Sequence, residues 1–140
     1  MLTTQKEIVI TVADRQRLGS LLIDAARLGL VERQHLDELE YELERATAVE
    51  PHEVPGDVIT MNSTARLRDL DADEALEYTL VYPRDANASE NRVSILAPMG
   101  TALIGYRTGE TIEWPVPGGT LRLAVEEVVY QPERAGDFNR

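Results

Sequence analysis

The sequence predicts an α+β protein in which an N-terminal antiparallel helical hairpin, a short coiled coil, precedes a β-sheet domain with one short helix. Apolar residues three and four positions apart recur in the first third of the 140-residue chain. Strand-like runs follow from residue 57 onward. Between these parts, residues 48–57 hold two prolines and a glycine without periodicity, as a linker does. We therefore expect two domains, at residues 1–50 and 51–140.

The first predicted helix begins at Thr11, whose spacing from Asp14 is that of a capping box with aspartate in place of glutamate. Gly29 breaks the apolar pattern, and a second helix follows. Because a short turn joins the two helices, we expect an antiparallel hairpin. Its seam consists of Leu18, Leu21, Leu22 and Ala25 in the first helix and of Leu36, Leu39, Leu43 and Ala46 in the second. The acidic residues of the second helix lie away from that seam and are expected to face water.

Five runs of residues have the composition and alternation of strands: 57–70, 76–83, 92–96, 110–116 and 120–130. In the last run Leu121, Leu123 and Val125 alternate with less apolar residues, as in a half-buried strand. The pair Glu126-Glu127 then shifts the phase, as a β-bulge would. Residues 117–119, Pro-Gly-Gly, fit a tight hairpin turn between the last two runs.

The segment at residues 97–110 holds three glycines, which raises the question of a phosphate-binding loop. A P-loop ends in Gly-Lys-Ser/Thr, whereas Gly105 is followed here by Tyr106 and Arg107. The spacing of a dinucleotide fingerprint is also missing. A short helix explains the segment better, because Pro98 suits a first helical turn and Gly105 suits the left-handed position at a helix end.

Charge and composition exclude several classes of function. Acidic residues number 25 against 14 basic ones, and Lys6 is the only lysine, so no basic stripe offsets the net charge of −11 and direct nucleic-acid binding is disfavoured. The absence of cysteine excludes disulfides, thiolate metal sites and cysteine nucleophiles. His35 and His52 have no partner at metal-ligand spacing and are expected on the surface. Without a signal peptide or a membrane-spanning run, we expect a cytoplasmic protein.

Residues 93–119 and 122–138 resemble the C-terminal domain of the bacterial Gre transcript-cleavage factors. They are more similar still to the Rnk branch of that family, the regulators of nucleoside diphosphate kinase. Residues 57–70 and 80–83 match this branch in the same order, and the run YQPERAGD at residues 130–137 makes the match specific. The resemblance implies an FKBP-like C-terminal domain, which is a curved antiparallel sheet around one short helix.

The resemblance also implies a bacterial transcription regulator whose partner is RNA polymerase, bound at the entrance of its secondary channel. By family matching, Ala97, Pro98, Met99 and Gly100 correspond to the Gre loop that contacts the polymerase. A proline-stiffened loop with an exposed methionine would be both pre-organised and adaptable for this contact. The alternative is that these four residues only begin a helix. DNA binding is implied only as a property of the family.

In Gre factors, two acidic residues at the tip of a long coiled coil help to hold the catalytic magnesium. Each helix here has about 15 residues and a length of about 22 Å, and the turn lacks the Asp-Leu-Lys-Glu-Asn core of the Gre tip. Asp24 and Glu32 flank the turn, but two carboxylates alone make a thin magnesium site. We therefore expect a non-catalytic regulator that competes with Gre factors and uses no metal, cofactor or small-molecule substrate.

Two enzymatic alternatives remain open. A Gre-type cleavage factor would use the hairpin-tip acids, and a vestigial FKBP-like prolyl isomerase would need a pocket lined by several aromatic side chains. Only 5% of the chain is aromatic, with one Trp and one Phe. No residue indicates direct contact with nucleoside diphosphate kinase, so any effect on that enzyme is expected to be indirect.

Overall fold

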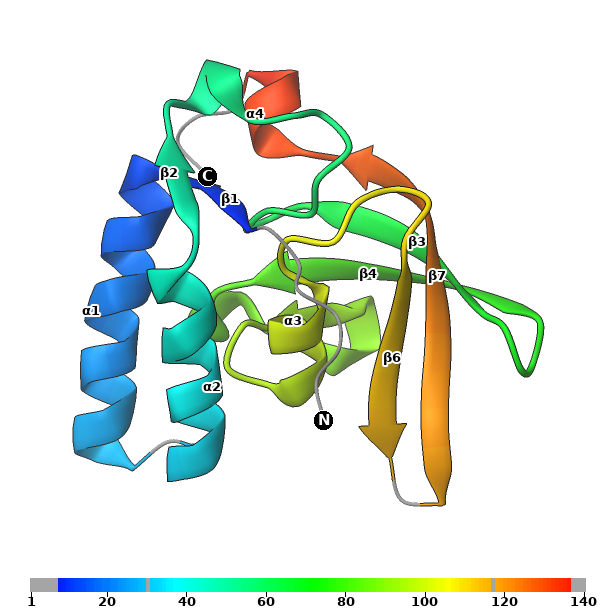
Figure 1. Ribbon diagram of the computed structural model, residues 1–140, viewed down its shortest axis with the longest axis horizontal. Helices are drawn as coiled ribbons and strands as arrows, with labels where there is room; N and C mark the ends of the chain where they lie inside the picture. Colours follow the sequence, from blue (N-terminus) through cyan, green and yellow to red (C-terminus); the bar gives the residue numbers. More distant parts are fainter. Residues whose placement is uncertain (1–7, 30, 117, 137–140) are drawn as a thin grey trace.

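The computed structural model describes residues 8–29, 31–116 and 118–136. The helical hairpin stands at one side of the molecule, a five-stranded sheet forms the other, and a short helix lies between them (Figure 1). The predicted order of elements, a helical hairpin followed by a sheet with one short inserted helix, is therefore confirmed. The structure adds a one-turn helix, α4, at Pro132–Ala135.

Helices α1 (Val12–Leu28) and α2 (Arg33–Glu44) form the predicted hairpin. The hydroxyl of Thr11 accepts the N–H of Asp14 at 3.0 Å, which confirms the N-cap. The carboxylate of Asp14 instead accepts a hydrogen bond from Tyr82. Gly29 ends α1 in the left-handed region, with φ of 66°. The seam is confirmed, because every one of its eight predicted residues is buried except Leu21, which is half-buried.

A small parallel sheet at the base of the hairpin has no counterpart in the sequence prediction. Strand β1 (Val9–Thr11) leads into α1 and pairs with β2 (Thr47–Val49), which follows α2. The predicted linker is therefore ordered from its beginning. It continues through the 3₁₀ turn η1 (Pro51–Glu53), and Val54 is buried.

The second half of the predicted linker is tied to the end of the chain. The side-chain amide of Gln131 donates to the carbonyl oxygens of Pro55 at 2.8 Å and Val58 at 2.7 Å. Arg134 donates to the carbonyl oxygen of Gly56 at 3.0 Å. Local composition could not predict these contacts, because the partners lie more than seventy residues apart in the sequence.

The large sheet has the strand order β5-β4-β3-β7-β6. Its strands are β3 (Thr64–Asp69), β4 (Glu74–Val81), β5 (Arg92–Ser94), β6 (Thr111–Val116) and β7 (Gly119–Tyr130). Val116 pairs with Gly119, as expected for a tight hairpin, although Pro117 lies outside the described residues. The bulge is confirmed too, because Arg66 faces Glu127 while Leu67 faces Val125, which leaves Glu126 unmatched.

The expected antiparallel sheet is mixed at one edge, because β5 pairs with β4 in parallel. Residues 82–91 connect these strands through two 3₁₀ turns, η2 (Pro83–Asp85) and η3 (Ala88–Glu90). This connection carries the chain back before β5 begins, so β5 runs in the same direction as β4. A connection of this kind leaves no periodic pattern in the sequence.

Helix α3 (Pro98–Leu103) packs between the hairpin and the sheet (Figure 1). One continuous apolar core includes buried side chains of the hairpin, such as Leu18 and Leu39, and of the sheet domain, such as Leu67 and Leu103. Gly105 follows α3 with φ of 88°, and a Cβ there would lie 2.7 Å from a side-chain carbon of Ile8. Glycine is therefore required both by the backbone conformation and by close packing.

Candidate functional site

The four residues predicted to contact a partner lie at the beginning of α3. Ala97 is the N-cap, and its N–H donates to the carbonyl oxygen of Ser94 at 3.0 Å. Its own carbonyl accepts the N–H of Thr101 at 3.0 Å. Pro98 occupies the first turn, as expected. This segment is therefore a rigid corner between β5 and α3.

Gly100 is fixed by close approach of the backbone. A Cβ at this position would lie 2.0 Å from the carbonyl oxygen of Ser94, a distance that no side chain can accept. Gly100 is also buried. Its role is to let the first turn of α3 touch the end of β5, so it cannot offer a side chain to a partner.

Met99 is half-buried and packs against the apolar core, together with Ala102 on the same helical face. The expectation of an exposed methionine was wrong, because the tight corner at Gly100 turns this face of α3 toward the core. Part of the Met99 side chain still reaches the surface. It is therefore partly scaffold and partly available for contact.

A histidine joins this corner to the hairpin. The Oγ1 of Thr101 donates to the carbonyl oxygen of Ile95 at 2.8 Å and lies 3.1 Å from Nε2 of His35 on α2. Because the hydroxyl has a single proton and gives it to Ile95, we assign His35 Nε2–H as the donor to Thr101. His35 is half-buried, so its expected place on the surface was wrong, whereas His52 is exposed.

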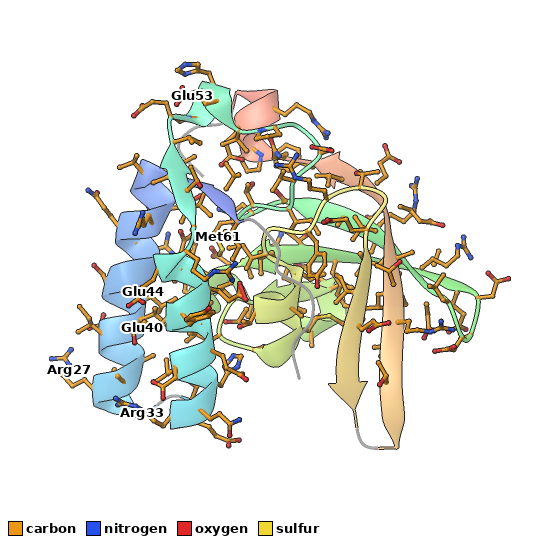
Figure 2. The ribbon with its side chains drawn as sticks, viewed as in Figure 1. Arg27, Arg33, Glu40, Glu44, Glu53 and Met61 are labelled. Atoms are coloured by element: carbon orange, nitrogen blue, oxygen red, sulfur yellow. The ribbon has the colours of Figure 1, made fainter. Side chains whose placement is uncertain are left out.

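The predicted tip residues Asp24 and Glu32 have different surroundings. The carboxylate of Asp24 accepts a hydrogen bond from Arg27 at 3.2 Å, one turn along α1. Glu32 is the N-cap of α2, but its side chain makes no capping hydrogen bond. Figure 2 shows Arg27 and Arg33 at the turn end of the hairpin, and Arg33 lies 3.4 Å from Asp37. The tip therefore presents paired charges of both signs.

Among residues 8–29, 31–116 and 118–136, no group of three or more His, Asp or Glu side chains could hold a metal ion. Within those ranges, no helix has both the length and the apolar character needed to cross a membrane.

A hydrogen bond between the buried Asp14 and the half-buried Tyr82 joins the start of α1 to the end of β4. The Tyr82 hydroxyl donates to Asp14 at 2.8 Å, and an Arg17 nitrogen lies 3.7 Å from the same carboxylate. Burial raises the pKa of Asp14, although Tyr82, Arg17 and Thr11 oppose the shift. Burial and the neighbouring Asp14 carboxylate raise the pKa of Tyr82, so this hydroxyl keeps its proton at neutral pH.

A half-buried carboxyl group lies on α4. Thr60 donates to Glu133 at 2.7 Å, and burial raises the pKa of Glu133, with a smaller contribution from Asp14. Sequence reasoning placed Asp14 at a helix start but missed both long-range partners. Tyr82 and Glu133 are separated in sequence from Asp14 and Thr60 by about seventy positions, and no local motif links them.

Two family models match successive parts of the chain. Residues 54–130 match the family described as transcription elongation factor GreA/GreB, C-terminal domain, and residues 6–49 match the Rnk N-terminus. The regulator of nucleoside diphosphate kinase from Escherichia coli K12 is 43% identical over 132 residues, which cover 94% of this chain and 95% of the relative. Transcription elongation factor GreA from Chlorobium phaeobacteroides is 33% identical, over 89% of this chain and 82% of its own length.

Solved structures agree with these relatives. A prokaryotic transcription elongation factor GreA/GreB from Nitrosomonas europaea matches with a TM-score of 0.76 and 45% identity, covering 89% of this chain and all of that one. The fold is thus that of the GreA/GreB factors, and its hairpin consists of 17- and 12-residue helices. The chain belongs to the GreA/GreB transcription elongation factor family and carries an Rnk-type N-terminal domain.

Proposed function

We propose that this protein is a non-catalytic, cytoplasmic regulator of transcription elongation that binds RNA polymerase at the entrance of the secondary channel. Family membership supports the partner, because the relatives include factors named for transcription elongation. The proposal that the protein is non-catalytic rests on the length of the hairpin and on the charges at its tip. Its longer helix has 17 residues, so it spans only about 25 Å, and near its tip Asp24 pairs with Arg27 and Asp37 pairs with Arg33.

The side chains at the hairpin tip favour a hairpin that occupies the channel entrance over one that takes part in catalysis. Magnesium takes six oxygen ligands and in proteins is held by one or two carboxylates together with phosphates. Asp24 accepts from Arg27, so a metal ion would compete with an existing hydrogen bond and meet a nearby positive charge. Glu32 is exposed, and the structure provides no third acidic side chain beside it among the described residues. A hairpin of this kind would fill the channel entrance without holding the catalytic ion.

The corner at Ala97–Gly100 is proposed as part of the docking surface. Its main chain is held by Ser94 and Thr101, so little ordering would be required on binding. Ala97 and Met99 are each partly exposed at this corner. The FKBP-like description of the sheet domain belongs to the same proposal, as the scaffold that presents this corner.

An effect on nucleoside diphosphate kinase is proposed to be indirect. The name of the Escherichia coli relative indicates regulation of that enzyme. A transcription regulator changes the amount of other proteins, so an altered kinase level needs no contact between the two proteins. Mixing the purified kinase and this protein should leave the kinase activity unchanged.

Competition on the polymerase tests the proposed function. Fluorescently labelled protein should bind core RNA polymerase, and an unlabelled Gre factor should displace it in a concentration-dependent way. Simultaneous binding of both proteins would place this chain elsewhere on the polymerase. Failure to bind the core enzyme and its elongation complex would remove the proposed partner.

A further inference from the structure

A cleft of about 1210 Å³ lies between α1 and the β4–η2–β5 edge of the sheet. One wall is formed by α1, through Gln16, Arg17, Ser20, Leu21 and Asp24. The other wall comes from the end of β4, from η2, from β5 and from the polar side chains Asn62, Thr64 and Thr79. The cleft is thus built from segments far apart in sequence and has no role in the proposed polymerase contact at α3.

Arginines from three different segments line this cleft: Arg17 on α1, Arg84 on η2 and Arg92 on β5. Two aspartates, Asp24 and Asp85, share the lining. Three arginines against two aspartates give the cleft a slight positive excess in a chain whose net charge is −11. The cleft lining is therefore less acidic than the molecule as a whole, although Asp14 and Glu90 lie within 4 Å of Arg17 and Arg92.

Arg84 and Arg92 are held more loosely than the arginines on the open face of the sheet. Arg68 and Arg122 make hydrogen-bonded ion pairs of 2.6 and 2.8 Å with Glu126 and Asp71. Arg84 lies 3.9 Å from its neighbour Asp85, and Arg92 lies 3.4 Å from Glu90. Neither pair meets hydrogen-bond geometry, so the guanidinium donors of Arg84 and Arg92 remain available to a ligand.

We propose that this cleft binds a phosphate-bearing small molecule. Guanidinium groups match phosphate oxygens with two parallel hydrogen bonds, and hydroxyl and amide side chains such as Ser20, Thr79 and Asn62 supply further donors. The carboxylates Asp24 and Asp85 limit the size of the anion that the cleft can accept. A long polyanion such as a nucleic-acid strand would be repelled by them and by the acidic surface beyond, whereas a compact phosphate group fits among the arginines.

Binding would also connect the two parts of the molecule. Arg17 belongs to the hairpin, while Arg84 and Arg92 belong to the sheet domain. A phosphate held by both sides should resist separation of the hairpin from the sheet. The ligand is therefore expected to raise the thermal midpoint of the full-length protein.

The test is a titration of the full-length protein with pyrophosphate. Binding is measured by isothermal titration calorimetry and by the arginine Nε–H signals in NMR spectra. We expect saturable binding in the native protein. In the double variant R84A/R92A the dissociation constant should rise at least about tenfold, because two charge-assisted contacts are removed. The matched control R122A removes an arginine of the open sheet face and should bind pyrophosphate as the native protein does.

Parallel titrations with adenosine diphosphate, adenosine and sulfate identify the source of the phosphate. Tighter binding of the nucleotide than of pyrophosphate supports a nucleotide ligand, and equal binding supports a free diphosphate. Circular dichroism confirms that the variants fold. Absence of saturation by about 1 mM pyrophosphate in the native protein would overturn the proposal, as would equal affinity in R84A/R92A or equal binding of adenosine.

Discussion

The hairpin and the sheet domain are stabilised by interactions of different range. The hairpin depends on apolar side chains at helical spacing, together with an N-cap at Thr11 and a left-handed end at Gly29. The sheet domain depends on pairings between distant strands and on contacts such as Gln131 with Pro55. Short sequence patterns thus determine the structure of the hairpin, whereas the sheet requires partners that only the folded chain brings together.

The boundary between the two regions combines both kinds of interaction. His35 reaches Thr101, and Asp14 reaches Tyr82, so polar side chains join the hairpin to the sheet domain across an otherwise apolar core. Each polar contact fixes the orientation of one region relative to the other, while the core buries apolar surface of both. The following predictions measure how far the two regions are independent.

The largest effect is expected from Leu39→Asp. Leu39 is fully buried in the hairpin seam, so an unpaired carboxylate there should cost about 3–5 kcal/mol and melt the hairpin. We predict that helical circular dichroism at 222 nm falls while the strand amide signals in NMR spectra persist, because the sheet keeps its own strand pairings. Glu38→Asp, at an exposed neighbouring position, is the control. Simultaneous loss of both sets of signals would contradict the division into two domains.

Two glycine substitutions compare how well the α3 corner and helix α1 tolerate an added methyl group. Gly100→Ala would place a Cβ 2.0 Å from the Ser94 carbonyl oxygen and should destabilise the protein by about 1–3 kcal/mol or more. Gly19→Ala on α1 meets nothing within 4 Å and should stabilise the protein by about 1 kcal/mol through helix propensity. Urea unfolding measures both. Equal effects of the two substitutions would mean that the corner at α3 relaxes freely.

Met99→Ala separates scaffold from contact at the same corner. Because Met99 is half-buried, truncation should cost about 1–2 kcal/mol of stability, less than a core methionine. Affinity for RNA polymerase should fall about tenfold if Met99 lies in the interface. The control is Met61→Ala, since Met61 is buried between the hairpin and the sheet (Figure 2) and should cost about 2–5 kcal/mol without a specific loss of affinity. Unchanged affinity in folded Met99→Ala would assign this side chain to the scaffold alone.

The smallest effect concerns Asp14 at the boundary. Because burial raises the pKa of Asp14, the folded protein binds this proton more readily than the unfolded chain. The contribution of Asp14 to stability is therefore full below its unfolded pKa and is lost as the pH rises through the folded pKa. Asp14→Asn keeps an acceptor for Tyr82 but does not titrate. The variant should gain stability relative to the native protein between about pH 4 and pH 7, as measured by urea unfolding.

Glu133 titrates in the native protein and in Asp14→Asn alike. The difference in stability between the two proteins therefore reports the titration of Asp14, together with its repulsion of Glu133. A relative loss of stability in Asp14→Asn at the higher pH would mean that the ionised carboxylate is stabilised by Tyr82 and Arg17 more than burial destabilises it.

The comparison of regions also explains what the sequence could predict. The seam of the hairpin, the N-cap at Thr11 and the bulge at Glu126 each arise from neighbours a few positions apart, and all three were predicted correctly. The parallel pairing of β1 with β2 and of β4 with β5 could not be predicted, since each depends on how an intervening segment returns the chain.

The candidate site follows the same rule. The helix start at Pro98 was predicted from residue type. The half-burial of Met99 was not, because it depends on Gly100 lying against Ser94. The contact between His35 and Thr101, and the cleft lined by Arg17, Arg84 and Arg92, unite residues whose separate positions carry no motif.

Transcript cleavage in backtracked elongation complexes tests the central claim most directly. With magnesium present, saturating protein should leave RNA cleavage at the intrinsic rate of the polymerase and should slow cleavage stimulated by a Gre factor. The variants Asp24→Ala and Glu32→Ala should behave like the native protein. Strong stimulation of cleavage by the native protein that disappears in either variant would contradict the claim, and would assign the hairpin tip a catalytic role.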